Sequence, residues 1–139
     1  MIPIPFKLRR TSRDLATFIQ TATEADGLVG TDEDGLVLQY RVKVTRSGGG
    51  ISRPVPTESE VRVARIPLGA MRRVELRRGW FRTKLVLAAA DLHAFEPFRA
   101  WLDGSGLTLA IPRAERSGAA DLASSIELAL STRLLNHGG

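Results

Sequence analysis

The stretch from Val61 to Ala90 constrains the fold more than any other part of the chain, because it alternates apolar and polar residues and is broken twice. Pro67 interrupts the first run, and Gly79 separates the later runs Met71–Arg78 and Phe81–Ala89. Alternation with a period of two is typical of half-buried strands, and proline and glycine mark turns. We therefore predict a strand, a sharp corner and a tight antiparallel hairpin.

The same alternation divides the side chains of this stretch between the two faces of each strand. The apolar residues predicted to face the core are Val61, Val63, Val74, Leu76, Leu85 and Leu87. The bases interleaved with them, beside Trp80, are Arg72, Arg73, Arg77, Arg78, Arg82 and Lys84. Because successive strand residues point to opposite faces, these bases do not form one patch on an isolated strand.

Further strands are predicted on both sides of this stretch. Residues Ile4 to Arg10 alternate, and Pro5 favours an edge position or the start of a strand. The segment Gly27 to Gly30 and the segment Leu36 to Thr45 flank a turn at Asp34-Gly35, which is a strong hairpin signal. A short last strand is predicted over 107–111.

Helical spacing of apolar residues appears near both ends of the chain. A short helix is predicted over 14–20, because Leu15, Phe18 and Ile19 fall on one face. A long amphipathic helix is predicted over about 114–135. Between the strands, three consecutive glycines and two prolines predict a flexible loop over about 46–60.

The length of 139 residues suits one domain with its own core, so we predict a single domain over residues 1–139. The absence of cysteine excludes disulfides and thiolate zinc sites, and it is typical of a reducing cytosol. No apolar run approaches the roughly 20 residues that span a bilayer. We predict a cytoplasmic protein without a transmembrane segment.

The net charge of +5 favours an anionic partner. Only three of the 20 bases are lysines, a skew that GC-rich codon usage also produces, so the arginine excess can be functional or compositional. Acids gather in residues 14–34 and bases in residues 62–84. These segments could pair within the fold or form two poles.

Seven short antiparallel strands cannot hide both faces in one flat sheet. We therefore predict an α+β fold, a seven-stranded antiparallel β-sandwich or open barrel that one long C-terminal helix caps. Three features carry a resemblance to a known fold: Ile66-Pro67-Leu68 before Met71-Arg72-Arg73-Val74, the Arg77-Arg78-Gly79-Trp80 hairpin, and a last strand running into residues 112–116. In these features the chain resembles the pleckstrin-homology-like (PH-like) superfold, and within it uncharacterised bacterial members.

The resemblance implies a scaffold whose relatives bind inositol-phosphate headgroups, peptides or other proteins and are generally not enzymes. Phosphoinositide-binding relatives carry a lysine at the end of the first strand and further bases on the second. Lys7 and Arg9 match the first half of that pattern, but residues 14–34 are acidic where the partner bases would lie. Together with the arginine-rich stretch, the candidate contacts to an anionic ligand are Lys7, Arg9, Arg73, Arg77, Arg82 and Lys84.

No residue pattern predicts a catalytic, cofactor or metal site. His93 lies near Asp91 and Glu96, a spacing that could suit a base or a metal but that a surface histidine in a turn also explains. The acidic run at 32–34 lacks the later ligands of a calcium loop. The three glycines at 48–50 lack the lysine and hydroxyl residue of a phosphate-binding loop.

Two classes of function remain open. The leading hypothesis is a non-catalytic interaction module that binds a protein, a peptide or its own copies at an exposed sheet edge or in a groove between sheet and helix. The alternative is an anionic ligand, a phospholipid headgroup or, less favoured, a nucleic acid, held by the basic clusters. An enzyme is not predicted.

Overall fold

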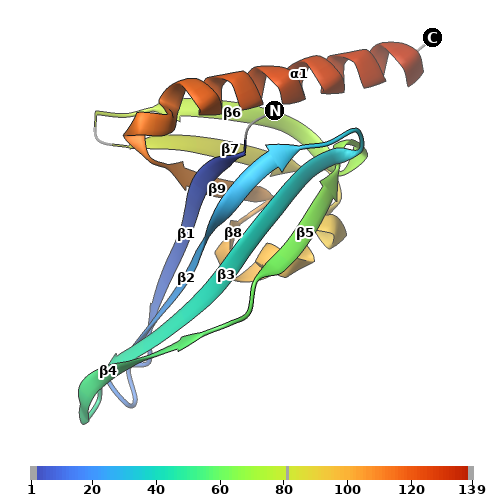
Figure 1. Ribbon diagram of the computed structural model, residues 1–139. Helices are drawn as coiled ribbons and strands as arrows, with labels where there is room; N and C mark the ends of the chain where they lie inside the picture. The colour runs from blue at the N-terminus through green and yellow to red at the C-terminus, as the bar shows by residue number, and fades with distance from the viewer. Residues whose placement is uncertain (1–2, 81, 138–139) are drawn as a thin grey trace.

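A single antiparallel sheet and one C-terminal α-helix make up the computed structural model, which describes residues 3–80 and 82–137 (Figure 1). Hydrogen-bonded neighbours follow the order β4-β3-β2-β1-β9-β7-β6, while β5 also pairs with β3 and β8 with β9. The strands are β1 (Ile4–Arg13), β2 (Ile19–Thr31), β3 (Gly35–Gly48), β4 (Ile51–Glu58), β5 (Arg62–Pro67), β6 (Met71–Arg78), β7 (Thr83–Ala89), β8 (Leu102–Asp103) and β9 (Gly106–Ile111).

The sheet stays open between β5 and β6, which follow each other in the chain but lie at opposite ends of the strand order. The predicted corner between them is confirmed, since the short 3-10 helix η1 (Leu68–Ala70) turns the chain there. The predicted hairpin is also confirmed: Gly79 donates its N–H to the carbonyl of Arg82 at 2.9 Å, and β6 pairs with β7. Phe81, predicted in the second strand, lies outside the described residues.

Helical segments cover the open sheet. The helix α1 (Arg116–His137) confirms the predicted C-terminal helix and packs against β6, with Ala119, Leu122 and Ile126 buried (Figure 1). The 3-10 segment η2 (Leu92–Trp101) inserts Phe95 and Phe98 fully into the core, and a last short turn, η3 (113–115), leads into α1. No helix among the described residues has the length and apolar character to cross a membrane.

The face of β5 that packs on the core is the opposite of the predicted one. Val61 and Val63 are 53% and 56% exposed, while Ala64 and Ile66 are buried. Residues directly opposite each other in a sheet share a face, and Ala64 and Ile66 pair with the buried Leu38 and Leu36 of β3. Pairing to β3 therefore sets the register, and Val63 points outward.

The helix predicted over 14–20 is wrong, because these residues form the end of a β-hairpin. Strand β1 runs to Arg13 and β2 begins at Ile19, and the Asp14 N–H donates to the Ile19 carbonyl at 2.9 Å. The Asp14 carboxylate accepts the N–H of Ala16 at 2.9 Å, which lowers its pKa. A helix of two turns is marginal alone, so pairing with a neighbouring strand overrides the local pattern.

The flexible loop predicted over 46–60 is also wrong. Strand β3 continues to Gly48, β4 pairs with it, and Gly48 and Gly49 turn the chain at φ of 81° and 57°. A side chain on Gly49 would lie 2.5 Å from the Thr17 carbonyl oxygen, so glycine lets the two hairpin turns pack together. Residues 9–24 and 43–58 form a long twisted projection, called the arm below, that points away from α1 (Figure 1).

Candidate binding site

The site lies where β1 and β9 separate. These strands pair through Lys7 and Ala110, and beyond this pair a cavity of about 430 Å³ opens between them. We call this cavity the basic groove. Its lining consists of Lys7, Leu8, Arg9, Glu24, Asp26, Arg82, Ala110, Ile111, Pro112 and Arg113.

Three of the six predicted contacts line the basic groove, although they come from distant parts of the chain. They are Lys7 and Arg9 on β1 and Arg82 just before β7. The other three, Arg73, Arg77 and Lys84, lie on β6 and β7 and do not line it. The structure therefore divides the arginine-rich stretch between the groove and the rest of the sheet.

Sequence reasoning missed Arg113, which completes the group of bases in the groove. It follows Pro112 at the end of the last strand, and that strand pairs with both β1 and β7. The available signal was positional: placing the last strand between the first strand and the hairpin brings Arg113 close to Lys7 and Arg82. The sequence alone does not state this strand order.

The groove holds more positive than negative charge. Lys7 Nζ lies 3.7 Å from the Asp26 carboxylate, and Arg9 Nε lies 3.4 Å from that of Glu24. Both pairs are exposed to solvent, and such pairs contribute about 0–1 kcal/mol because water screens them. Arg82 and Arg113 have no acidic partner among the residues that the structure describes. These two guanidinium groups are the ones available to a ligand.

The floor of the groove is apolar. Leu8 and Ile111 are almost fully buried, and Ala110 and Pro112 add carbon surface beside them. The arrangement is thus a charged rim over an apolar base, which suits a ligand that carries carboxylates along a carbon chain. A compact inorganic anion would leave the floor without contacts.

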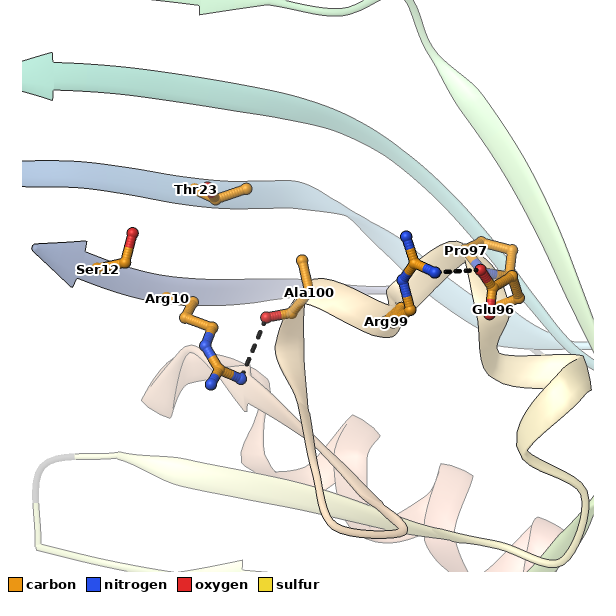
Figure 2. A pocket seen from close by; sticks show the side chains of 7 residues that line it. All are labelled: Arg10, Ser12, Thr23, Glu96, Pro97, Arg99 and Ala100. Carbon is orange, nitrogen blue, oxygen red and sulfur yellow. Dashed lines mark hydrogen bonds and ion pairs between the residues drawn. The ribbon is translucent and has the colours of Figure 1, made fainter. Parts of the chain in front are cut away.

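A second cavity of about 580 Å³, called the inner pocket, lies between the arm and η2 (Figure 2). Arg10 donates from Nη1 to the carbonyls of Ala100 and Leu102, both at 3.3 Å. Nearby, Arg99 pairs with Glu96 at 3.2 Å. The inner pocket is lined by Arg10, Ser12, Thr23, Glu96, Pro97, Arg99 and Ala100.

The end of η2 is fixed to the sheet beside this pocket. The indole Nε1 of Trp101 donates to the Thr23 carbonyl at 3.0 Å, and the rings of Phe98 and Tyr40 lie 5.1 Å apart. Buried aromatic pairs of this kind contribute about 0.5–1.5 kcal/mol beyond the burial of their area. These contacts therefore hold the end of η2 in a fixed position on the sheet, beside the inner pocket.

The polar clusters that the sequence singled out elsewhere have structural roles. The Asp91 carboxylate accepts the N–H of His93 at 3.0 Å at the start of η2, and His93 is exposed. The Asp32 carboxylate accepts the N–H groups of Asp34 and Gly35 and pairs with Arg65, and these contacts lower its pKa. Within residues 3–80 and 82–137, no three histidine or acidic side chains gather as metal ligands.

Comparisons with protein-family models, with curated proteins and with solved structures find no match to this chain. No relative therefore assigns a role to either cavity. What the basic groove can bind has to follow from its own shape, charge and position in the sheet.

Proposed function

We propose that the chain is a non-catalytic interaction module that binds an acidic segment of a partner protein in the basic groove. The observation that carries this proposal is the convergence of Lys7, Arg9, Arg82 and Arg113 on an open cavity with an apolar floor. Carboxylates of the segment would pair with Arg82 and Arg113, and its carbon atoms would cover the floor. Complementary charge of this kind raises association rates and selects the partner.

The chemistry of the two cavities supports binding over catalysis. Neither lining contains a histidine, the residue that most often transfers protons near neutral pH. Each carboxylate in the linings, those of Glu24, Asp26 and Glu96, is in an ion pair with a neighbouring base. We therefore assign these paired carboxylates a structural role.

We also propose that the architecture is that of the PH-like superfold. The support is its order of elements, an open antiparallel sheet built of hairpins and followed by one C-terminal helix against the sheet. A sharp corner between two consecutive strands at η1 agrees with the same scaffold. Scaffolds of this kind bind ligands at their loops and strand edges, and the basic groove lies where the edges of β1 and β9 separate.

A peptide titration tests the proposal. A labelled peptide of alternating glutamate and small residues is titrated by fluorescence anisotropy at low and at physiological salt. The R82E/R113E variant should bind about tenfold or more weakly, because it reverses the two unpaired charges. The matched control is R72E/R73E, which reverses two exposed charges on β6 outside both cavities.

Parallel titrations with anionic vesicles and with single-stranded oligonucleotides separate the competing ligand classes. Under the proposal the peptide binds, and the groove variant loses far more affinity than the control variant. Equal losses in both variants would reduce the binding to nonspecific attraction. Tighter groove-dependent binding of vesicles or oligonucleotides than of the peptide would replace the acidic partner with a lipid headgroup or a nucleic acid.

A further inference from the structure

One edge of the arm carries backbone groups that point away from the sheet. The Asp14 N–H donates to the Ile19 carbonyl, which fixes these two residues as a hydrogen-bonded pair between β1 and β2. Bonded and non-bonded pairs alternate along an antiparallel ladder. Ser12 and Arg10 therefore bond to β2, while the N–H and C=O groups of residues 9, 11 and 13 point outward.

These outward groups have no strand beside them in the described part of the chain. Lys7 has the same orientation and reaches Ala110 of β9, but the pairing of β1 with β9 ends at that residue. The backbone groups of Arg9, Thr11 and Arg13 have no backbone partner among the residues of the structure. We call residues 9–13 the free edge of β1. An edge of this kind is a template for another strand.

The opposite edge of the arm is unsuited to the same use. The Ser59 N–H donates to the Val42 carbonyl at 2.8 Å, which fixes the ladder between β3 and β4. By the same alternation Pro56 directs its nitrogen atom outward, and proline has no N–H to donate. Pro54, which also lacks an N–H, lies where the register of this ladder shifts. An outward donor is therefore missing on β4 at Pro56. Of the two edges, the free edge of β1 retains its donors.

Both cavities lie beside this free edge. Arg9 lines the basic groove on the outer face of β1, while Arg10 and Ser12 line the inner pocket on the other face. An added strand would send successive side chains alternately to these two faces. The side chains on the outer face would meet the bases of the groove and Arg13, which has no acidic partner among the described side chains.

We propose that an acidic segment of a partner protein binds as an added β-strand on the free edge of β1, with acidic residues at every second position. This inference rests on the proposed function and adds the binding mode and the spacing of the acids. A second copy of the chain does not fit as the added strand, because Arg9 and Arg13 of both copies would lie on the same face of the joined strands. Like charges opposite each other destabilise a strand pair.

Hydrogen exchange on the full chain measures the binding mode directly. When the alternating glutamate peptide is added, the amides of Arg9, Thr11 and Arg13 should become protected, because they gain carbonyl partners. The amides of Arg10 and Ser12 serve as internal controls, since they already bond to β2. Slowing of exchange by tenfold or more at the three outward amides is expected at saturating peptide.

N-methylation of the peptide backbone provides an independent readout. Methyl groups on the amides that face β1 should weaken binding tenfold or more, while methyl groups on the alternate amides should leave it nearly unchanged. On the protein side, Thr11→Pro removes one outward donor without removing a bond to β2, and Thr11→Ala is its control. Thr11→Pro should lose affinity while Thr11→Ala keeps it.

The outcomes separate this inference from the proposed function. If the peptide binds through the groove bases but neither amide protection nor sensitivity to alternate N-methylation appears, strand addition is wrong and the acidic-ligand function stands. If the unmethylated peptide does not bind at low salt, both are overturned. The N-methylated peptides keep the test decisive if Thr11→Pro does not fold.

Discussion

The substitution Gly27→Ala tests the packing at the centre of the sheet. A Cβ atom on Gly27 would lie 1.9 Å from the Gln39 carbonyl oxygen, whereas ordinary van der Waals contact begins at 3.4 Å. The oxygen would have to move about 1.5 Å, the difference between these values. It belongs to the backbone of β3, and Gln39 pairs with Leu28 on one side and Val63 on the other, so no side-chain rotation relieves the overlap.

The expected cost follows from this geometry. Overpacking a well-packed interior costs about 1–3 kcal/mol, and a clash with paired backbone belongs at the upper end. Replacing glycine stabilises by about 0.4–1 kcal/mol through the entropy of the unfolded chain, which leaves a net loss of about 2 kcal/mol. For a chain of 139 residues this loss lowers Tm by about 7 °C.

The matched control is Gly30→Ala in the same strand. A Cβ atom there would lie 3.6 Å from Pro3, an ordinary contact, and the backbone φ of Gly30 is not positive. This variant should therefore be neutral or raise Tm by about 2 °C. Urea unfolding and thermal melts of both variants make the comparison. Equal stabilities for the two variants would refute the packing described at Gly27.

Two further predictions concern the hairpin turns. Phe18 has a φ of 58° and is 70% exposed, so Phe18→Asn should stabilise the fold by about 1 kcal/mol, because asparagine tolerates the left-handed region better. The control is Leu15→Asn, at a side chain that is 79% exposed, and it should change Tm little. Equal effects of the two substitutions on Tm would contradict the strain at Phe18. At the β2–β3 turn, the N–H of Asp34, and then those of Gly35 and Arg65, hold the pKa of Asp32 below its ordinary value. The stabilisation by Asp32 is thus present above its unfolded-state pKa and is lost as pH falls through its folded-state pKa. In Asp32→Asn, the urea midpoint of unfolding should therefore fall less steeply as the pH is lowered. An unchanged dependence of the midpoint on acidic pH would refute the role of these contacts.

Local sequence patterns predicted the elements whose neighbours in space are also neighbours in sequence. The corner at η1, the hairpin around Gly79 and the turn at Asp34-Gly35 all involve contacts within a few residues. The C-terminal helix carries its buried face as a regular spacing of Ala119, Leu122 and Ile126, so it too could be predicted. Each of these features is encoded by the segment that forms it.

The errors occurred where distant pairing decides the structure. Leu15 and Phe18 have helical spacing, yet both are exposed at a hairpin turn because β1 and β2 pair up to Arg13 and Ile19. The glycine and proline content of residues 46–60 suggested a loop, but β3 provides a template on which β4 forms. Val63 points outward because the core face of β3 fixes the register of β5. None of these partners is visible in a local window.

The candidate site divides in the same way. Lys7 and Arg9 could be predicted from their place on the first strand, but their convergence with Arg82 depends on β9 lying between β1 and β7. The sequence predicts that the acids of residues 14–34 and the bases of residues 62–84 pair within the fold or form two poles, and one such pair forms, between Asp32 and Arg65. Two other acids, Glu24 and Asp26, pair with Arg9 and Lys7 across the β1–β2 ladder. The two bases of the groove without an acidic partner among the described residues, Arg82 and Arg113, lie next to β7 and β9. The sequence does not specify where these two strands lie in the sheet.

A long arm with two open edges would be expected to pair with other copies of itself, and the two edges of this arm resist that in different ways. On β4, Pro56 removes an outward donor and Pro54 also lacks an N–H, so this edge offers fewer hydrogen bonds to any added strand. On β1 the donors remain, and charge on Arg9 and Arg13 opposes a second copy of the same edge. Proline blocks pairing without regard to the partner, whereas charge blocks only partners of the same sign. An edge protected by arginine alone is thus closed to its own copies and open to an acidic strand.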